Sequence, residues 1–173
     1  MSRLGNRAVR TLAVLTVALL FRASALDSLP GFNEDEAWAA RNAARFAVGA
    51  EPLDLLRLYP HGINQDLLGG YQPGFYYAWP AAFLRAAGWS RTAWRMTSIL
   101  PSLLMVLCLY PLGAGLLGER KAFLAALFLA ASRWHASDGR WGWVVVFAAA
   151  LGLAGVLLVA RGSRGRPFPC AAG

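Results

Sequence analysis

Three consecutive acidic residues, Glu34, Asp35 and Glu36, are the clearest candidates for catalytic chemistry in the sequence. Asn33 before them is a suitable N-cap and Glu36 follows three residues later, so the acids are expected in the first turn of a helix over 34–48. Neighbouring helical residues point about 100° apart, so Asp35 and Glu36 cannot share one proton. One of them can face a substrate while the other caps or orients. The alternative is that all three only complement the helix dipole.

Arginines and one histidine are the second group of candidates. Arg95 stands at the start of a long apolar run with Arg91 one turn before it. His135 lies at the far end of a later run, and Asp138 and Arg140 follow in the turn after it. An arginine in such a place is either an anchor at a membrane surface or a bidentate ligand for phosphate. A histidine at a helix end can be purely structural, and Asp138 can simply pair with Arg140.

The composition is that of an integral membrane protein. Hydrophobic residues make up 57% of the 173 residues and the mean hydropathy is +0.44, above the usual range of soluble domains. Lys and Arg number 17 against nine Asp and Glu. Because these cations flank apolar runs and form no basic face, they are interpreted as a topology signal, and no nucleic acid is expected as a partner. The two cysteines have no metal-ligand spacing, so no metal site is expected.

Four apolar runs predict four transmembrane helices, at 11–26, 96–117, 122–136 and 141–160. Since the first run follows basic residues and ends in small ones, a cleaved signal peptide is the alternative there. Residues 75–87 are also apolar, but this stretch is short and contains Pro80 and Arg85. It is therefore expected to lie along the membrane interface. The predicted fold is an all-α membrane bundle of about four spans, with interfacial helices in its first extracytoplasmic loop.

Charge asymmetry gives the expected orientation. The segment from Asp27 to Gln72 has a net charge of −4, whereas the rest of the chain has a net charge of +12. The positive-inside rule then places the basic clusters in the cytoplasm and the loop over 27–95 outside. We therefore expect residues 1–160 to form a multi-pass domain in the plasma (inner) membrane. Residues 161–173 are expected to be a basic tail that is disordered or truncated.

Several short motifs occur in a fixed order along the chain: Asn33-Glu34-Asp35-Glu36-Ala37, Tyr71-Gln72-Pro73-Gly74-Phe75-Tyr76-Tyr77, Gly88-Trp89-Ser90-Arg91-Thr92-Ala93-Trp94-Arg95, Leu117-Gly118-Glu119-Arg120-Lys121, Trp134-His135 and Arg140. This order resembles the N-terminal part of the polyprenyl-phosphate-sugar glycosyltransferases of the GT-C fold. Protein O-mannosyltransferases and the aminoarabinose transferases that modify lipid A belong to that group. The resemblance covers roughly residues 8–160, and it depends on the ordered set, because no single motif is specific.

The resemblance implies roles for individual residues. Asp35 falls on the family's catalytic base, with Glu36 beside it, and Arg95, Arg140 and His135 fall on the site of the donor phosphate. The chemistry then needs one carboxylate to take the proton of an acceptor hydroxyl and cations to hold the departing phosphate. The expected result is inversion at the anomeric carbon. No cofactor is required beyond the lipid-phosphate-sugar donor, and a role for a divalent metal stays open.

The chain also departs from the family. Tyr71 and Gln72 fall on a substrate-loop motif, but Gln72 stands where His or Lys is frequent, and Arg133 stands where Pro is usual. Family members continue through further spans, so the chain is expected to be truncated and to show no measurable transfer alone. The acceptor would be a glycan, a lipid or a protein. The alternatives are a non-catalytic membrane protein or a small transporter subunit, although a transporter predicts ionisable residues in mid-span.

Overall fold

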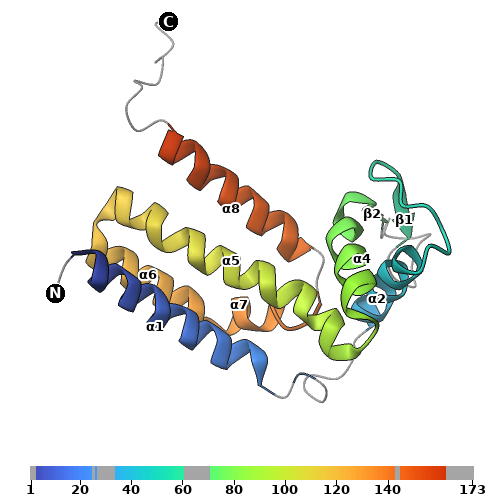
Figure 1. The fold of residues 1–173 in the computed structure, drawn as a ribbon, viewed down its shortest axis with the longest axis horizontal. Helices are drawn as coiled ribbons and strands as arrows, with labels where there is room; N and C mark the ends of the chain where they lie inside the picture. Colours follow the sequence, from blue (N-terminus) through green and yellow to red (C-terminus); the bar gives the residue numbers. More distant parts are fainter. Residues whose placement is uncertain (1–2, 25, 27–33, 61–70, 143–144, 163–173) are drawn as a thin grey trace, which may run out of the picture.

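The computed structural model describes residues 3–24, 26, 34–60, 71–142 and 145–162. Within these ranges the chain forms seven helices and one antiparallel pair of short strands (Figure 1). In order they are α1 (Arg3–Ala23), α2 (Glu34–Ala47), β1 (Leu58–Pro60), β2 (Tyr71–Pro73), α4 (Phe75–Ala87), α5 (Arg91–Leu117), α6 (Glu119–Ala131), α7 (Arg133–Asp138) and α8 (Val145–Gly162). The fold is all-α apart from the strand pair. In the described part of the chain, α5 alone is both long and apolar enough to cross a membrane, while α8 is apolar but shorter.

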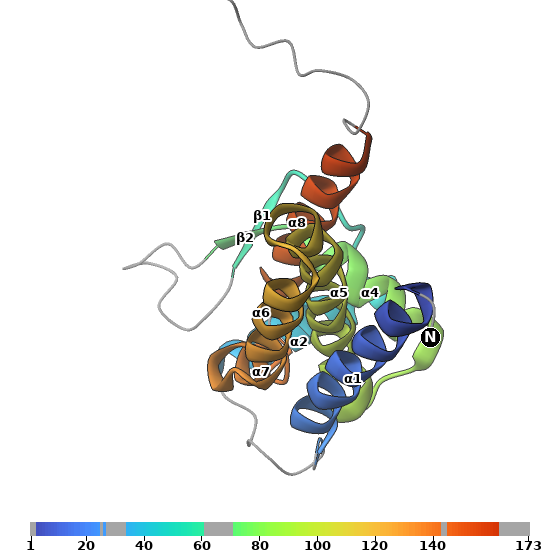
Figure 2. The same cartoon turned by 90° about the vertical axis from the view of Figure 1, so that its left-hand side faces the viewer.

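Helix α5 is the axis of the molecule. Helices α1 and α6 pack together on one side of it and α8 packs on the opposite side (Figures 1 and 2). The core between α1, α5 and α6 contains Val14, Val106 and Tyr110, together with alanines on α6 at every fourth position: Ala122, Ala126 and Ala130. Residues four apart share one face of a helix, so these alanines give α6 a narrow face that lets it approach its neighbours closely.

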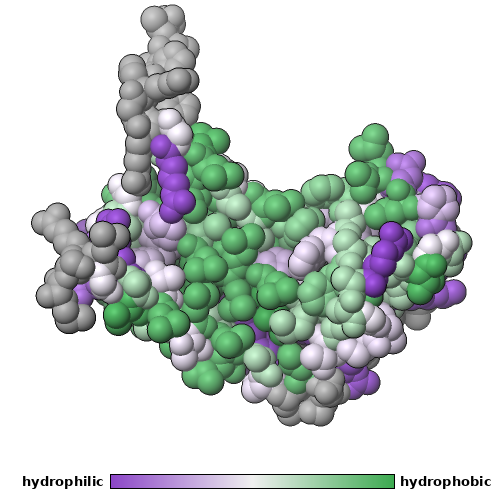
Figure 3. Space-filling view, in the orientation of Figure 1, coloured by the Kyte–Doolittle hydropathy of each residue, from purple (hydrophilic) through white to green (hydrophobic). Residues whose placement is uncertain are grey.

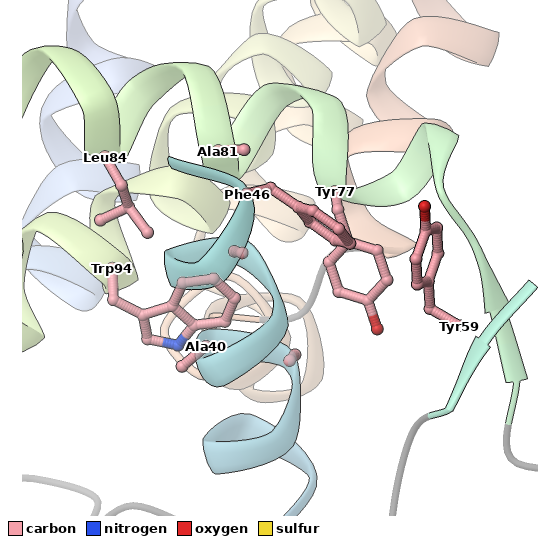
Figure 4. Close-up of a cluster of buried hydrophobic side chains, with 9 residues drawn as sticks. Ala40, Phe46, Tyr59, Tyr77, Ala81, Leu84 and Trp94 are labelled. Carbon is pink, nitrogen blue, oxygen red and sulfur yellow. The ribbon is translucent and has the colours of Figure 1, made fainter. Parts of the chain in front are cut away.

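A second core lies where α2 and α4 meet the start of α5, and we call it the loop core (Figure 4). Three of its aromatic rings pack together, with the centroids of Phe46 and Tyr59 4.8 Å apart and those of Tyr59 and Tyr77 6.2 Å apart. Trp94 of α5 is fully buried in the same cluster. Because Tyr59 belongs to β1, which pairs with β2 ahead of α4, the strand pair is tied to this core.

Two helices outside the proposed spans agree with the sequence. The helix predicted over 34–48 is α2, which ends just before Gly49 with its positive φ of 71°, and the helix predicted over 75–87 is α4. The proposed cap Asn33 lies outside the described residues. The predicted all-α fold included no strands, whereas residues 58–60 and 71–73 between these helices form an antiparallel pair.

The boundaries of the apolar helices differ from the prediction. Helix α5 begins at Arg91, five residues before the predicted start, because the Ser90 hydroxyl accepts the Ala93 N–H at 2.9 Å and caps the helix. The third run does not continue as one helix to residue 136. Its helix α6 ends at Ala131, and Ser132 leaves the helical region with φ −58° and ψ 123° before α7 begins. Helix α8 begins at Val145, four residues after the predicted start.

Gly142 is expected to be required for the packing of Trp94. Its φ is 69°, and a β-carbon there would lie 2.1 Å from Trp94 Nε1. Gly142→Ala should therefore lower the free energy of unfolding by about 2 kcal/mol, through overpacking and backbone strain. Gly152→Ala is the matched control, because nothing lies within 4 Å of that position. Equal melting temperatures of the two variants in detergent micelles would contradict this account of Gly142.

Candidate functional site

A buried ion pair joins the first turn of α2 to the start of α5. Arg95 Nε donates to Glu36 Oε1 at 3.0 Å and Arg95 Nη2 donates to Glu36 Oε2 at 3.2 Å. Both side chains have no exposed area. This parallel, bidentate geometry fixes the plane of the guanidinium as well as its position. Glu36 is thus placed to orient Arg95, and it lies away from any surface where an acceptor hydroxyl could reach it.

Asp35 precedes this pair in the first turn of α2. Its side chain lies outside the described residues, so only its place on the helix is defined. Of the two adjacent acids, Glu36 takes the orienting role that the sequence predicted for one of them.

Arg95 and Arg140 both reach the turn that follows α1. Arg95 Nη1 donates to the Leu26 carbonyl at 2.5 Å, and Arg140 Nη2 donates to the Ser24 carbonyl at 2.6 Å. The two acceptors are only two residues apart, although the arginines come from different parts of the chain. The end of α1, the starts of α2 and α5 and the turn after α7 therefore meet at one end of the bundle. Asp138, the other proposed partner of Arg140, is exposed.

Arg22, which the sequence analysis passed over, is completely buried near the end of α1. Its Nε donates to Ser102 Oγ at 2.6 Å, its Nη1 donates to the carbonyls of Ala18 at 2.9 Å and Ala130 at 2.8 Å, and its Nη2 contacts His135 Nδ1. Within the described ranges its partners include no carboxylate. The available signal was a single arginine inside an apolar run, since a cation in that setting is costly and frequently functional.

His135 lies in α7, beyond the end of α6, and contacts Arg22 through Nδ1. Burial and the neighbouring Arg22 charge lower the pKa of His135 to about 4, against a smaller opposite effect of the Leu129 carbonyl. The imidazole is therefore neutral near pH 7. Its Nε2 is buried and has no hydrogen-bond partner among the residues that the structure describes. A neutral imidazole that accepts from Arg22 at Nδ1 has an N–H to donate at Nε2.

A cavity of about 480 Å³ opens beside α7, and we call it the α7 cavity. It is lined by residues from the ends of α1 and α6 and from α7 and the turn after it: Phe21, Ala131, Arg133, Ala136, Ser137, Arg140 and Trp141. Its volume is within the range of small-ligand sites. Two arginines on a largely apolar wall suit a ligand with an anionic head and an apolar body. Arg140 links this cavity to the turn after α1.

The proposed substrate-loop residues lie in a different part of the fold. Gln72 is half-buried in β2 opposite Tyr59 of β1, and Tyr71 is opposite Pro60. Tyr59 packs in the loop core, so this strand pair belongs to the α2–α4 side of the molecule. The structure thus brings together the regions of Glu36, Arg95, Arg140 and His135, and it places Tyr71 and Gln72 on the strand pair.

Comparisons of the chain with protein-family models, with curated proteins and with solved structures give no match. The case for a function therefore depends on the geometry above and on the resemblance in motif order.

Proposed function

We propose that this chain works in a membrane glycosyltransferase that moves a sugar from a polyprenyl phosphate to an acceptor hydroxyl on the extracytoplasmic side. The observation that supports it best is the meeting of α2, α5 and Arg140 at the turn after α1. The motifs that carry the family resemblance are far apart in the sequence, and several of them lie at this one end of the bundle.

In the proposed reaction, Asp35 accepts the proton of the acceptor hydroxyl as its oxygen attacks the anomeric carbon. The bond from that carbon to the lipid phosphate breaks, and configuration inverts. Arg140, on the wall of the α7 cavity, stabilises the negative charge of the departing phosphate. Arg95 is neutralised by Glu36, so its part in this proposal is to hold the starts of α2 and α5 together beside the site. Phosphate is a good leaving group, so no general acid is needed.

The proposal places the chain across the membrane several times, with the α7 end outside. Surface hydropathy supports it, because apolar residues cover the middle of α5 and α8 while hydrophilic residues gather toward the two ends (Figure 3). Large exposed apolar side chains also lie on α1 and α6, for example Leu12, Leu20 and Phe128. An apolar surface of this extent is unusual on a soluble monomer and is suited to lipid.

Cysteine labelling is expected to place residue 51 outside and residue 116 inside. Leu116 is 74% exposed at the end of α5, and Glu51 is partly exposed between α2 and β1, so Glu51→Cys and Leu116→Cys serve as the two probes. Both are made in a background with Cys108 and Cys170 replaced by alanine. A membrane-impermeant maleimide added to intact cells should label residue 51 alone. Labelling of residue 116 from outside would contradict the proposed orientation.

The donor site is tested by binding. The purified chain in nanodiscs is expected to bind a long-chain polyprenyl phosphate more tightly than the matching polyprenol, since only the former carries the charge that Arg140 recognises. Arg140→Gln should weaken binding of the phosphate about tenfold, the equivalent of about 1.4 kcal/mol. Arg41→Gln is the control, because Arg41 stacks on Trp38 and does not line the cavity. Equal losses in the two variants would count against the α7 cavity as the donor site.

A further inference from the structure

A second charged cavity lies at the opposite end of α5, away from Arg95. Its volume is about 470 Å³, and we call it the Arg161 cavity. It is enclosed by the first turns of α1, the last turns of α5 and the end of α8. Its polar lining includes Arg7, Thr11, Tyr110, Glu119 and Arg161, and much of the rest is apolar surface of α5. The glycosyl transfer proposed above makes no use of this cavity.

The charges around this cavity do not cancel. Glu119 forms an ion pair with Arg7, lies 3.9 Å from Arg10 Nη1, and accepts the Tyr110 hydroxyl at 2.7 Å through Oε2. One carboxylate is thus shared between two arginines of α1. Arg161 approaches from α8 and brings a third positive charge to the same cavity. The local sum is positive even with Glu119 ionised.

The shape and chemistry of this lining suit one class of ligand. Guanidinium groups recognise phosphate through paired, charge-assisted hydrogen bonds. The apolar wall of α5 offers a surface for a glycerol backbone and the first acyl carbons. Basic pockets between helices at the cytoplasmic side of a membrane are suited to anionic headgroups. A metal cation is disfavoured here, because the described lining offers one carboxylate against two arginines.

We propose that the Arg161 cavity binds the phosphate of an anionic glycerophospholipid of the cytoplasmic leaflet. The proposal rests on the membrane orientation given above and not on sugar transfer. The lipid would join α8 to α1, because Arg161 and Arg7 would hold one headgroup between them. This bridge matters for the fold, since α8 packs on α5 on the side opposite α1 and α6.

The test is native mass spectrometry of the full chain released from nanodiscs of equal parts phosphatidylglycerol and phosphatidylcholine. The wild-type chain should retain phosphatidylglycerol about tenfold over phosphatidylcholine, a preference of about 1.4 kcal/mol. Arg161→Gln should abolish this preference, and Arg161→Lys should restore part of it by keeping the charge. Arg120→Gln is the matched control, because Arg120 is exposed at the same end but does not line the cavity.

Three results would overturn the proposal. Equal retention of the two lipids by the wild-type chain would show that the cavity does not select a negative headgroup. Equal loss in Arg161→Gln and Arg120→Gln would show general attraction to the membrane surface. Displacement of phosphatidylglycerol by millimolar inorganic phosphate would identify a soluble phosphate as the ligand. Melting temperatures of the variants separate loss of binding from loss of fold, and cysteine labelling reports a failed orientation independently.

Discussion

Replacing Glu36 with leucine is expected to lower the free energy of unfolding by about 3–5 kcal/mol, because it leaves the guanidinium of Arg95 buried without a counter-charge. Both side chains of the pair are fully buried, so no water can take the place of the carboxylate. Glu51→Gln is the matched control. Glu51 pairs with Arg45 at 2.9 Å and Arg57 at 3.8 Å near the surface, where loss of an ion pair costs about 1 kcal/mol or less.

The double replacement of Glu36 by leucine and Arg95 by methionine separates the cost of an unpaired buried charge from the net contribution of the ion pair to stability. It removes both charges together, so much of the lost stability should return, as in other buried pairs exchanged for apolar residues. The measurement is reversible unfolding of the purified protein in mixed micelles. If Glu36→Leu costs no more than Glu51→Gln, the pair does not hold α2 against α5, and the placement of Asp35 beside it loses its support.

In a full-length relative, the change that corresponds to Asp35→Asn is expected to slow sugar transfer by about 10²–10⁴-fold, because general-base catalysis contributes a factor of that size and the amide cannot accept the proton. Binding of polyprenyl phosphate should change little. The assay follows a labelled sugar in native membranes from strains whose own gene copy carries the change. Glu34→Gln is the matched control, an acid of the same helical turn with the same loss of charge. Near-normal transfer with Asp35→Asn would remove Asp35 from its proposed role.

Local sequence patterns predicted the two helices of the loop over 27–95, α2 and α4, well. The helix over 34–48 was predicted from a capping asparagine and acids in a first turn, and α2 spans Glu34–Ala47. The helix over 75–87 matches α4 at both ends, because Gly74 and Gly88 flank it and interrupt the apolar pattern. These helix boundaries are determined by residues within a few positions of each end, so they can be predicted from the local sequence.

The remaining features depend on contacts between distant residues. Arg95 pairs with the carboxylate of Glu36, 59 positions away in the sequence. Arg22 contacts His135, 113 positions away. The hydrophobic periodicity of the sequence does not reveal pairs between such distant residues. The strand pair was missed because three-residue strands are too short to show alternation. The break at Ser132 was missed because neither glycine nor proline marks it, so hydropathy alone gave one helix where the chain forms α6 and α7.

The most direct test of the proposed function is photo-crosslinking of a polyprenyl phosphate that carries a diazirine near its phosphate. In vesicles containing the full chain, the probe is expected to label residues 131–141, which line much of the α7 cavity. Excess unlabelled polyprenyl phosphate should suppress the labelling, whereas polyprenol should not. Labelling spread along the exposed apolar residues of α8, or labelling that polyprenol suppresses equally, would contradict a phosphate-specific donor site at this end of the bundle.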